Sequence, residues 1–287
     1  MGERQRLGDV VDVYVAAQIA VILGNEDRLR DGDLGAVHPT RVAVRRLRST
    51  LRSFDVYKRP AVAELHSELR WYARLLGRLR DTDVVARRLE RALADVDDRD
   101  SAHAAAIALQ KLVSERSAAA WVELGTVLGG KRYKNLRRTL TAWRTEPPLT
   151  KRADGPASEV ADHVGVARRE MADKLERAER AAADGAADAI ERAHSARRAG
   201  KRYRYAAEVA VAVVGDEAIA IAKKGRKLQN ALGEQQDAGT ALAFLEDLSA
   251  AADPVAAPAL DELRRREEAI VADADRVLAA ARAEAGA

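Results

Sequence analysis

The chain contains no cysteine and very few aromatic residues. Among its 287 residues no cysteine occurs, and phenylalanine, tryptophan and tyrosine together make up 4%. Without cysteine the protein has no disulfide scaffold, no thiolate metal site and no cysteine nucleophile. The scarcity of aromatic rings disfavours a surface that stacks nucleic-acid bases. The length still allows one large domain or two, with a sizeable core.

The sequence also lacks a long apolar run. The longest run near the start, Val13 to Leu23, is interrupted by Gln18 and preceded by Asp9 and Asp12. Its shortness and acidic flank argue against a transmembrane span and a signal peptide, and favour an amphipathic helix. We therefore expect a soluble, unprocessed, cytoplasmic protein that binds no membrane.

The pattern of apolar residues predicts helices almost throughout the chain. No segment alternates as a strand would, so we predict an all-α fold. The helices are expected at 8–30, 38–57, 61–79, 82–96, 101–124, 131–145, 157–184, 187–213, 216–231, 237–250 and 256–284. After the sixth, Pro147 and Pro148 remove two hydrogen-bond donors and predict a linker.

Positive charge is concentrated in three segments, although the net charge is only +4. Residues 38–59 carry seven Arg and Lys and one acid, and residues 131–144 and 192–205 carry six bases each and no acid. In contrast, residues 245–287 carry ten acids and five bases. Basic clusters on a nearly neutral chain indicate an anionic partner.

Two basic motifs recur at a fixed offset of 156 positions. The segment HPTRVAVRRLR beginning at His38 aligns with HSARRAGKRYR beginning at His194, and Leu76-Gly77 with Leu232-Gly233. Because two separate motifs share one offset, we predict an internal duplication. Within a single domain of residues 1–287, we expect a first helical repeat at 8–130, a connector helix and proline linker at 131–155, and a second repeat at 156–287. Each repeat should form its own bundle, related to the other by pseudo-two-fold symmetry.

Each motif places its bases on one face of a helix. On a helical wheel the first stripe falls within an arc of roughly 80°, and it contains His38, Arg41, Arg45, Arg48 and Arg52. The second stripe is formed in the same way by His194, Arg197, Lys201 and Arg204. Such rows of like charge repel one another. Either a polyanion supplies the missing charge, or Asp81, Asp237 and the acidic C-terminal helix do; we favour the polyanion.

Further bases are candidates to extend this surface, and the histidines allow several roles. The additional candidates are Arg74, Arg78, Arg132, Lys134, Lys223 and Lys227. Arg46 and Arg202 lie off the stripes and are expected to form internal salt bridges. For His38 and His194 we prefer a hydrogen-bond donor at the head of a helix to a metal ligand, since adjacent arginines oppose a cation. The other histidines, His66, His103 and His163, are expected to be ordinary surface residues.

Motifs for nucleotide, zinc-protease or serine-hydrolase chemistry are absent. The Leu-Gly pairs at 76–77 and 232–233 are interpreted as helix ends, with Asp81 and Asp237 as N-caps of the following helices. We expect no cofactor, no metal and no catalytic residue.

The quoted motifs resemble those of the conserved histidine α-helical domain (CHAD) family. The resemblance rests on His38–Arg48 followed by Leu76-Gly77-Arg-Leu-Arg80-Asp81-Thr-Asp83-Val84, with a weaker copy at His194–Arg204 and Leu232–Asp237. It implies two four-helix bundles around a basic central groove or pore. It also implies binding of inorganic polyphosphate, in some members at polyphosphate granules, here by a stand-alone member through the two stripes. Gly200 departs from the pattern inside the second motif.

Three hypotheses of function remain at this point. The first, which we favour, is a non-enzymatic polyphosphate-binding module that also contacts other proteins of polyphosphate metabolism. The second is nucleic-acid binding, in which Tyr203 and Tyr205 are the only rings within the basic motif. The third is an enzyme of phosphate metabolism, such as a metal-dependent phosphohydrolase that uses the two repeated histidines.

Overall fold

The structure is a computed structural model that describes residues 5–273, apart from the side chains of 227–232. Within this range it is all-α and contains no strand. The α-helices are α1 (Leu7–Gly24), α2 (Glu26–Arg30), α3 (Leu34–Ser53), α4 (Arg59–Leu93), α5 (Arg99–Gly129), α6 (Lys131–Thr145), α7 (Val160–Ala183), α8 (Ala189–Val214), α9 (Asp216–Ala251) and α10 (Ala257–Ala272). The end of the helix expected at 256–284 lies outside the described residues. The prediction of an all-α fold is confirmed.

Two predicted helix breaks are wrong. Helix α4 runs through Gly77 and Asp81, and α9 runs through Gly233 and Asp237, so neither aspartate caps a helix. A glycine inside a helix costs only about 1 kcal/mol relative to alanine. In α4 that cost is offset by buried leucines on both sides of Gly77, because the helix spans two hydrophobic cores.

Helix α3 begins one turn earlier than the sequence suggests. The carboxylate of Asp33 accepts a hydrogen bond from the backbone N–H of Gly35 over 2.7 Å and caps the helix. His38 therefore lies in the second turn rather than at the head of the helix, which corrects the position expected for it.

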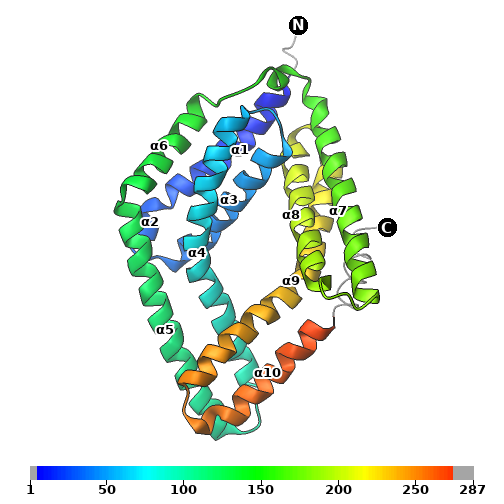
Figure 1. Ribbon diagram of the computed structural model, residues 1–287. Helices are drawn as coiled ribbons and strands as arrows, with labels where there is room; N and C mark the ends of the chain where they lie inside the picture. The colour runs from blue at the N-terminus through cyan, green and yellow to red at the C-terminus, as the bar shows by residue number, and fades with distance from the viewer. Residues whose placement is uncertain (1–4, 274–287) are drawn as a thin grey trace.

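The linker at the two prolines is present where it was predicted. Helix α6 ends at Thr145, and the chain then crosses the upper end of the molecule to α7 (Figure 1). Single antiparallel β-bridges between backbone segments pair Tyr57 with Leu149 and Arg6 with Pro156. The linker is thus fixed to α1 and to the turn before α4.

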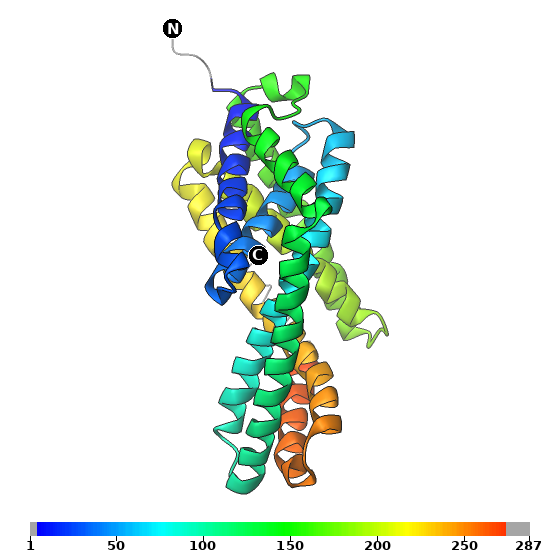
Figure 2. The ribbon, with the colours of Figure 1, turned by 90° about the vertical axis from the view of Figure 1, so that its left-hand side faces the viewer.

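The helices pack around two separate hydrophobic cores. The upper core includes Ile19 of α1, Leu47 of α3, Tyr133 of α6 and Val164 of α7. The lower core joins the C-terminal half of α4 and the N-terminal half of α5 to α9 and α10, through Leu89, Leu109, Leu245 and Leu263. Figure 2 shows this lower four-helix bundle extending away from the rest. Each core therefore draws on both halves of the chain, and the expectation of one bundle per repeat is wrong.

The duplication stays a prediction, although α4 and α9, which the offset aligns, are the two longest described helices at 35 and 36 residues. Both pass from one core to the other. Because they cross the middle of the molecule, they carry side chains into the space between the cores.

Helix α1 is apolar around most of its circumference. The segment Leu7–Arg30 is long and apolar enough to cross a membrane by length and composition alone, contrary to our estimate from the sequence. In the fold, Leu7, Val11 and Ile22 of this segment are fully buried in the upper core. Burial inside a large core accounts for a helix that is hydrophobic on most faces.

Helices α8 and α9 approach each other closely at Gly225. A Cβ atom on this glycine would lie 2.9 Å from the Cβ of Arg204, whereas a Cβ on Gly239 of the same helix would meet nothing within 4 Å. The absence of a side chain at Gly225 thus allows α9 to pack closely against α8, the helix that carries the second basic motif.

We predict that Gly225→Ala and Gly239→Ala have opposite effects on stability. Gly239→Ala should raise the free energy of unfolding by roughly 0.5–1 kcal/mol, because it gains helix propensity alone. Gly225→Ala should lower it by about 1 kcal/mol or more, since overpacking costs more than the propensity gained. Urea denaturation of both variants measures this, and equal stabilisation by the two would contradict the close approach.

Candidate anion-binding site

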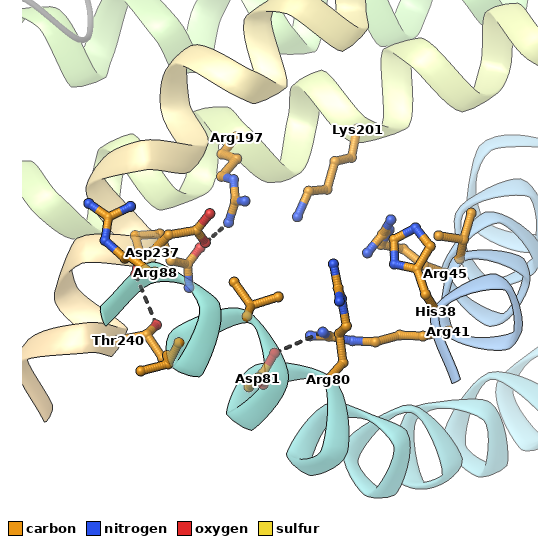
Figure 3. A pocket seen from close by; sticks show the side chains of 14 residues that line it. His38, Arg41, Arg45, Arg80, Asp81, Arg88, Arg197, Lys201, Asp237 and Thr240 are labelled. Atoms are coloured by element: carbon orange, nitrogen blue, oxygen red, sulfur yellow. Dashed lines mark hydrogen bonds and ion pairs between the residues drawn. The ribbon is translucent and has the colours of Figure 1, made fainter. Parts of the chain in front are cut away.

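A pocket of about 250 Å³ lies between the two basic motifs. Four helices line it: α3, α4, α8 and α9. Figure 3 shows Arg197 and Lys201 of α8 entering from one side and His38, Arg41 and Arg45 of α3 from another. The two stripes thus converge on one shared space.

The helical spacing of the motifs explains this convergence. His38, Arg41 and Arg45 are separated by three and four residues, and Arg197 and Lys201 by four, so each set lies on one helix face. The opposite faces of both helices are buried in the upper core. The core therefore holds the polar faces toward each other.

The pocket also contains residues that sequence analysis did not propose as ligands. Helix α4 supplies Arg80 and Arg88, and α9 supplies Gln236 and Thr240. Arg80 and Arg88 were missed because the sequence was divided into two helices near Gly77. In one continuous helix they lie eight residues apart with Val84 between them, which is the i, i+4, i+8 spacing of a single face.

Of the six described Arg and Lys side chains that line the pocket, half are neutralised by ion pairs. Arg41 pairs with Asp81 over 2.8 Å, and Arg80 pairs with Asp83. A third, Arg88, lies 2.7 Å from each of two further carboxylates, those of Glu234 and Glu267. The alternative that acids balance the stripes therefore holds in part, at Arg41 of the first stripe and, through Glu208, at Arg204 of the second.

The other three, Arg45, Arg197 and Lys201, make no ion pair with any described carboxylate. The Nε of Arg45 donates a 2.8 Å hydrogen bond to the hydroxyl of Tyr205, a neutral acceptor. Arg197 donates to the side-chain carbonyl of Gln236, and its Nε is buried without a partner. Asp237 lines the same pocket but lies beyond ion-pair distance of these cations. This side of the pocket carries uncompensated positive charge.

Crowding of like charge shifts the protonation of the pocket. Burial, together with the charges of Arg197, Arg45 and Arg41, lowers the pKa of Lys201 to about 7. Burial and nearby arginines also lower the pKa of His38, while burial raises the pKa of Asp237. In each case burial disfavours the charged form of the side chain, so the neutral form is populated closer to neutral pH than usual.

The remaining stripe residues lie outside this pocket. Arg48 and Arg52 form a separate group along α3 with the additional candidate Arg74 of α4. Arg204 and Lys223 line a second opening with Arg46 and Glu208. His194 is absent from the pocket lining, and its pKa is lowered by burial and by Arg197.

Three candidate bases point to other surfaces. Arg78 pairs with Glu123 over 2.8 Å, and Arg132 forms a two-pronged contact with Glu68 over 2.7 and 2.8 Å. Lys134 lies beside α1 and α2 in a different hollow. The side chain of Lys227 lies outside the described residues. Sequence spacing alone did not separate these bases from the pocket residues.

The interpretation of the basic residues that flank the stripes is confirmed. Arg46 pairs with Glu208 over 2.8 Å, and Arg202 pairs with Glu170. Two of the supposed surface histidines are corrected. His163 hydrogen-bonds the carbonyl of Ser53 over 2.9 Å, and His66 is half-buried among arginines.

The chemistry that this geometry allows is recognition of an anion. Guanidinium forks match phosphate oxygens in pairs, and a lysine adds a compact charge. In the described part of the chain no group of three or more histidines and carboxylates could hold a metal ion.

We predict that Lys201→Met stabilises the protein without added ligand at pH 6. The folded state lowers the pKa of Lys201, so folding releases protons between about pH 7 and pH 10 and wild-type stability rises with pH there. The gain from Lys201→Met should be roughly 1–2 kcal/mol at pH 6, after allowance for solvent screening, and should shrink toward pH 9.5.

Urea denaturation at the two pH values measures this gain. Lys151→Met, at an exposed lysine, serves as the control and should change stability by less than about 0.5 kcal/mol. A loss of stability in Lys201→Met at pH 6 would contradict the picture of a charge crowded by its neighbours.

Comparison with known proteins agrees with this architecture. The family model for the CHAD domain matches residues 13–246. The fold is similar to that of PptA from Streptomyces chartreusis, with 19% identity, a TM-score of 0.78 and coverage of 97% of this chain and 99% of that one. It is also similar to the crystal structure of the CHAD domain from the plant Ricinus communis, with 28% identity, a TM-score of 0.73 and coverage of 99% and 94%. No curated protein matches the chain by sequence. Because the family model covers most of the chain, this protein belongs to the CHAD domain family.

Proposed function

We propose that the central pocket binds inorganic polyphosphate and that the protein acts as a binding module without catalysis. The observation that carries the proposal is the set of three cations, Arg45, Arg197 and Lys201, that share a pocket without a described carboxylate partner. A polyanion would supply the missing charge and relieve their repulsion. Membership of a family associated with polyphosphate supports the same ligand.

The composition of the pocket favours a phosphate chain over a nucleic acid. None of the described residues that line it is Phe, Tyr or Trp, and the imidazole of His38 is the one ring among them, so bases would find little surface on which to stack. Tyr205 touches the site only through its hydroxyl, which accepts the hydrogen bond from Arg45. Recognition would therefore depend on the repeating charge of the ligand alone.

We also propose where the protein works and which proteins it meets. A module of this kind would work in the cytoplasm, where it would be carried to polyphosphate granules by its ligand. There it would meet other proteins of polyphosphate metabolism. It would need no cofactor, because binding by charge uses side chains that the chain itself provides.

We predict that Arg45→Gln combined with Arg197→Gln weakens binding of long-chain polyphosphate by at least about a hundredfold. Each charge-assisted contact is worth roughly 1.5–3 kcal/mol, and each removed contact should also make the salt dependence shallower by about 0.7 in log–log slope. Titration of fluorescent polyphosphate at three salt concentrations measures both quantities.

The matched control is Arg177→Gln with Arg180→Gln, which removes two exposed arginines from α7. It carries the same change in net charge and should bind within about twofold of wild type. Equal losses in the two double variants would refute the pocket as the binding site. Displacement of polyphosphate by DNA or RNA at equal phosphate concentration would favour nucleic acid instead.

We predict no shortening of polyphosphate by the protein with or without Mg²⁺. The pocket carboxylates Asp81 and Asp237 lie among cations, and no described cluster could hold a metal. Gel analysis of chain length after prolonged incubation measures this. Shortened chains or free phosphate, lost in His38→Ala or Asp237→Asn, would show an enzyme.

A further inference from the structure

A second group of bases lies along α3 and α4, next to the pocket. We call it the α3–α4 cluster; its members are Arg48, Arg52, His66, Arg70 and Arg74. The two helices run antiparallel, because Arg41 pairs with Asp81 while Arg48 lies near Arg70 and Arg74. Residues near the C-terminal end of α3 therefore lie beside residues in the N-terminal half of α4.

The cluster carries positive charge that no described carboxylate balances. None of its five members makes a hydrogen bond or an ion pair with a described acid. The Nε of Arg48 is buried without a hydrogen-bond partner. Burial and the charges of Arg70, Arg52 and Arg74 lower the pKa of Arg48. Burial and the charges of Arg48, Arg52 and Arg70 lower the pKa of His66 to about 4.

The nearest glutamates on α4 do not neutralise this charge. Glu68 is held on the other side by Arg132, whose guanidinium also lies 4.1 Å from the centre of the Trp71 ring. Glu64 is two residues before His66, which places it about 160° away around the helix axis. Glu68 is thus close to the cluster in sequence, but it pairs with Arg132 instead.

The cluster continues directly from the pocket. Arg48 follows the pocket residue Arg45 by one turn of α3, and Arg52 lies two turns beyond it, about 10 Å along the axis. An extended chain of phosphates that fills the pocket and leaves it along α3 would meet the cluster next.

The corresponding place in the second half is neutralised. The offset of 156 aligns Arg48 with Arg204, Arg52 with Glu208 and His66 with Ala222. Glu208 pairs with Arg204 over 2.9 Å and with Arg46 over 2.8 Å. It also accepts a 2.7 Å hydrogen bond from the hydroxyl of Tyr14. One glutamate in place of an arginine thus turns the second copy into an internal contact among α1, α3 and α8.

We propose that the α3–α4 cluster is a second phosphate subsite, which holds the part of a polyphosphate chain that leaves the pocket along α3. The subsite rests on the proposed function of the pocket. It makes the ligand leave the pocket along α3 rather than along α8, because Glu208 neutralises the equivalent position on α8. It also makes the protein discriminate by length, since a short chain fills the pocket without reaching Arg52 or Arg70.

The test compares Arg70→Gln/Arg74→Gln with Lys224→Gln/Arg226→Gln. Both double variants remove two charges from exposed positions, on α4 and on the aligned helix α9. Binding of tripolyphosphate and of long-chain polyphosphate is measured for each at 0.15 M salt, where exposed charges act over about 8 Å. We expect Arg70→Gln/Arg74→Gln to weaken the long chain about tenfold and tripolyphosphate less than twofold, with the α9 variant near wild type for both.

The outcomes separate this subsite from the pocket. Equal losses of long-chain binding in the two variants would overturn the subsite, since charge anywhere on the surface would then suffice. A tenfold loss for tripolyphosphate as well would also overturn it, because the cluster would then act through the pocket. If wild type binds neither ligand, or Arg45→Gln/Arg197→Gln binds as wild type does, the proposed function fails instead.

His66 offers a second measurement that leaves the arginines intact. An anion beside Arg48, Arg52 and Arg70 would offset their repulsion and raise the pKa of His66. We expect an NMR titration of the imidazole to shift upward by at least one pH unit with long-chain polyphosphate and to stay unchanged with tripolyphosphate. An unchanged titration with the long chain would overturn the subsite.

Discussion

The architecture depends on holding like charges close together against their repulsion. Arg45, Arg197 and Lys201 meet in one pocket without a described carboxylate partner, and burial adds to the cost of charging Arg197 and Lys201. Packing in the two hydrophobic cores offsets this repulsion, since the cores fix the helices above and below the pocket. Because α4 and α9 pass through both cores, the pocket cannot relax without disturbing them. A ligand of opposite charge would therefore be bound by a site already arranged for it.

The two halves of the chain use related motifs for different purposes. At the pocket both halves of the chain contribute cations. One turn further along each stripe, the surroundings of the cations differ between the two halves. In the first half the bases beyond the pocket stay uncompensated, whereas in the second half Glu208 binds Arg204 and Arg46 and ties three helices together. The second half thus holds the helices in place, while the first half extends the basic surface. This asymmetry suits a long ligand that enters a shared pocket and continues along one side.

Much of the fold and part of the site could be predicted from sequence. Apolar periodicity located the helices and Pro147-Pro148 located the linker, because both act locally. The three- and four-residue spacing of the bases placed them on common faces. Spacing could not show that Gly77 and Gly233 lie inside helices, since packing in two cores overrides a local preference. It also missed Arg80 and Arg88, and it could not show that Arg78 and Arg132 pair with distant glutamates.

The most direct test is a crystal structure of the protein with bound long-chain polyphosphate. The account predicts phosphate density between Arg45 of α3 and the pair Arg197 and Lys201 of α8, continuing along α3 past Arg48. It also predicts that the helices keep their positions, since the site exists before the ligand arrives. Phosphates confined to the outer face of α6, with Asp237 turned to pair with Arg197 and Lys201 in an empty pocket, would contradict it.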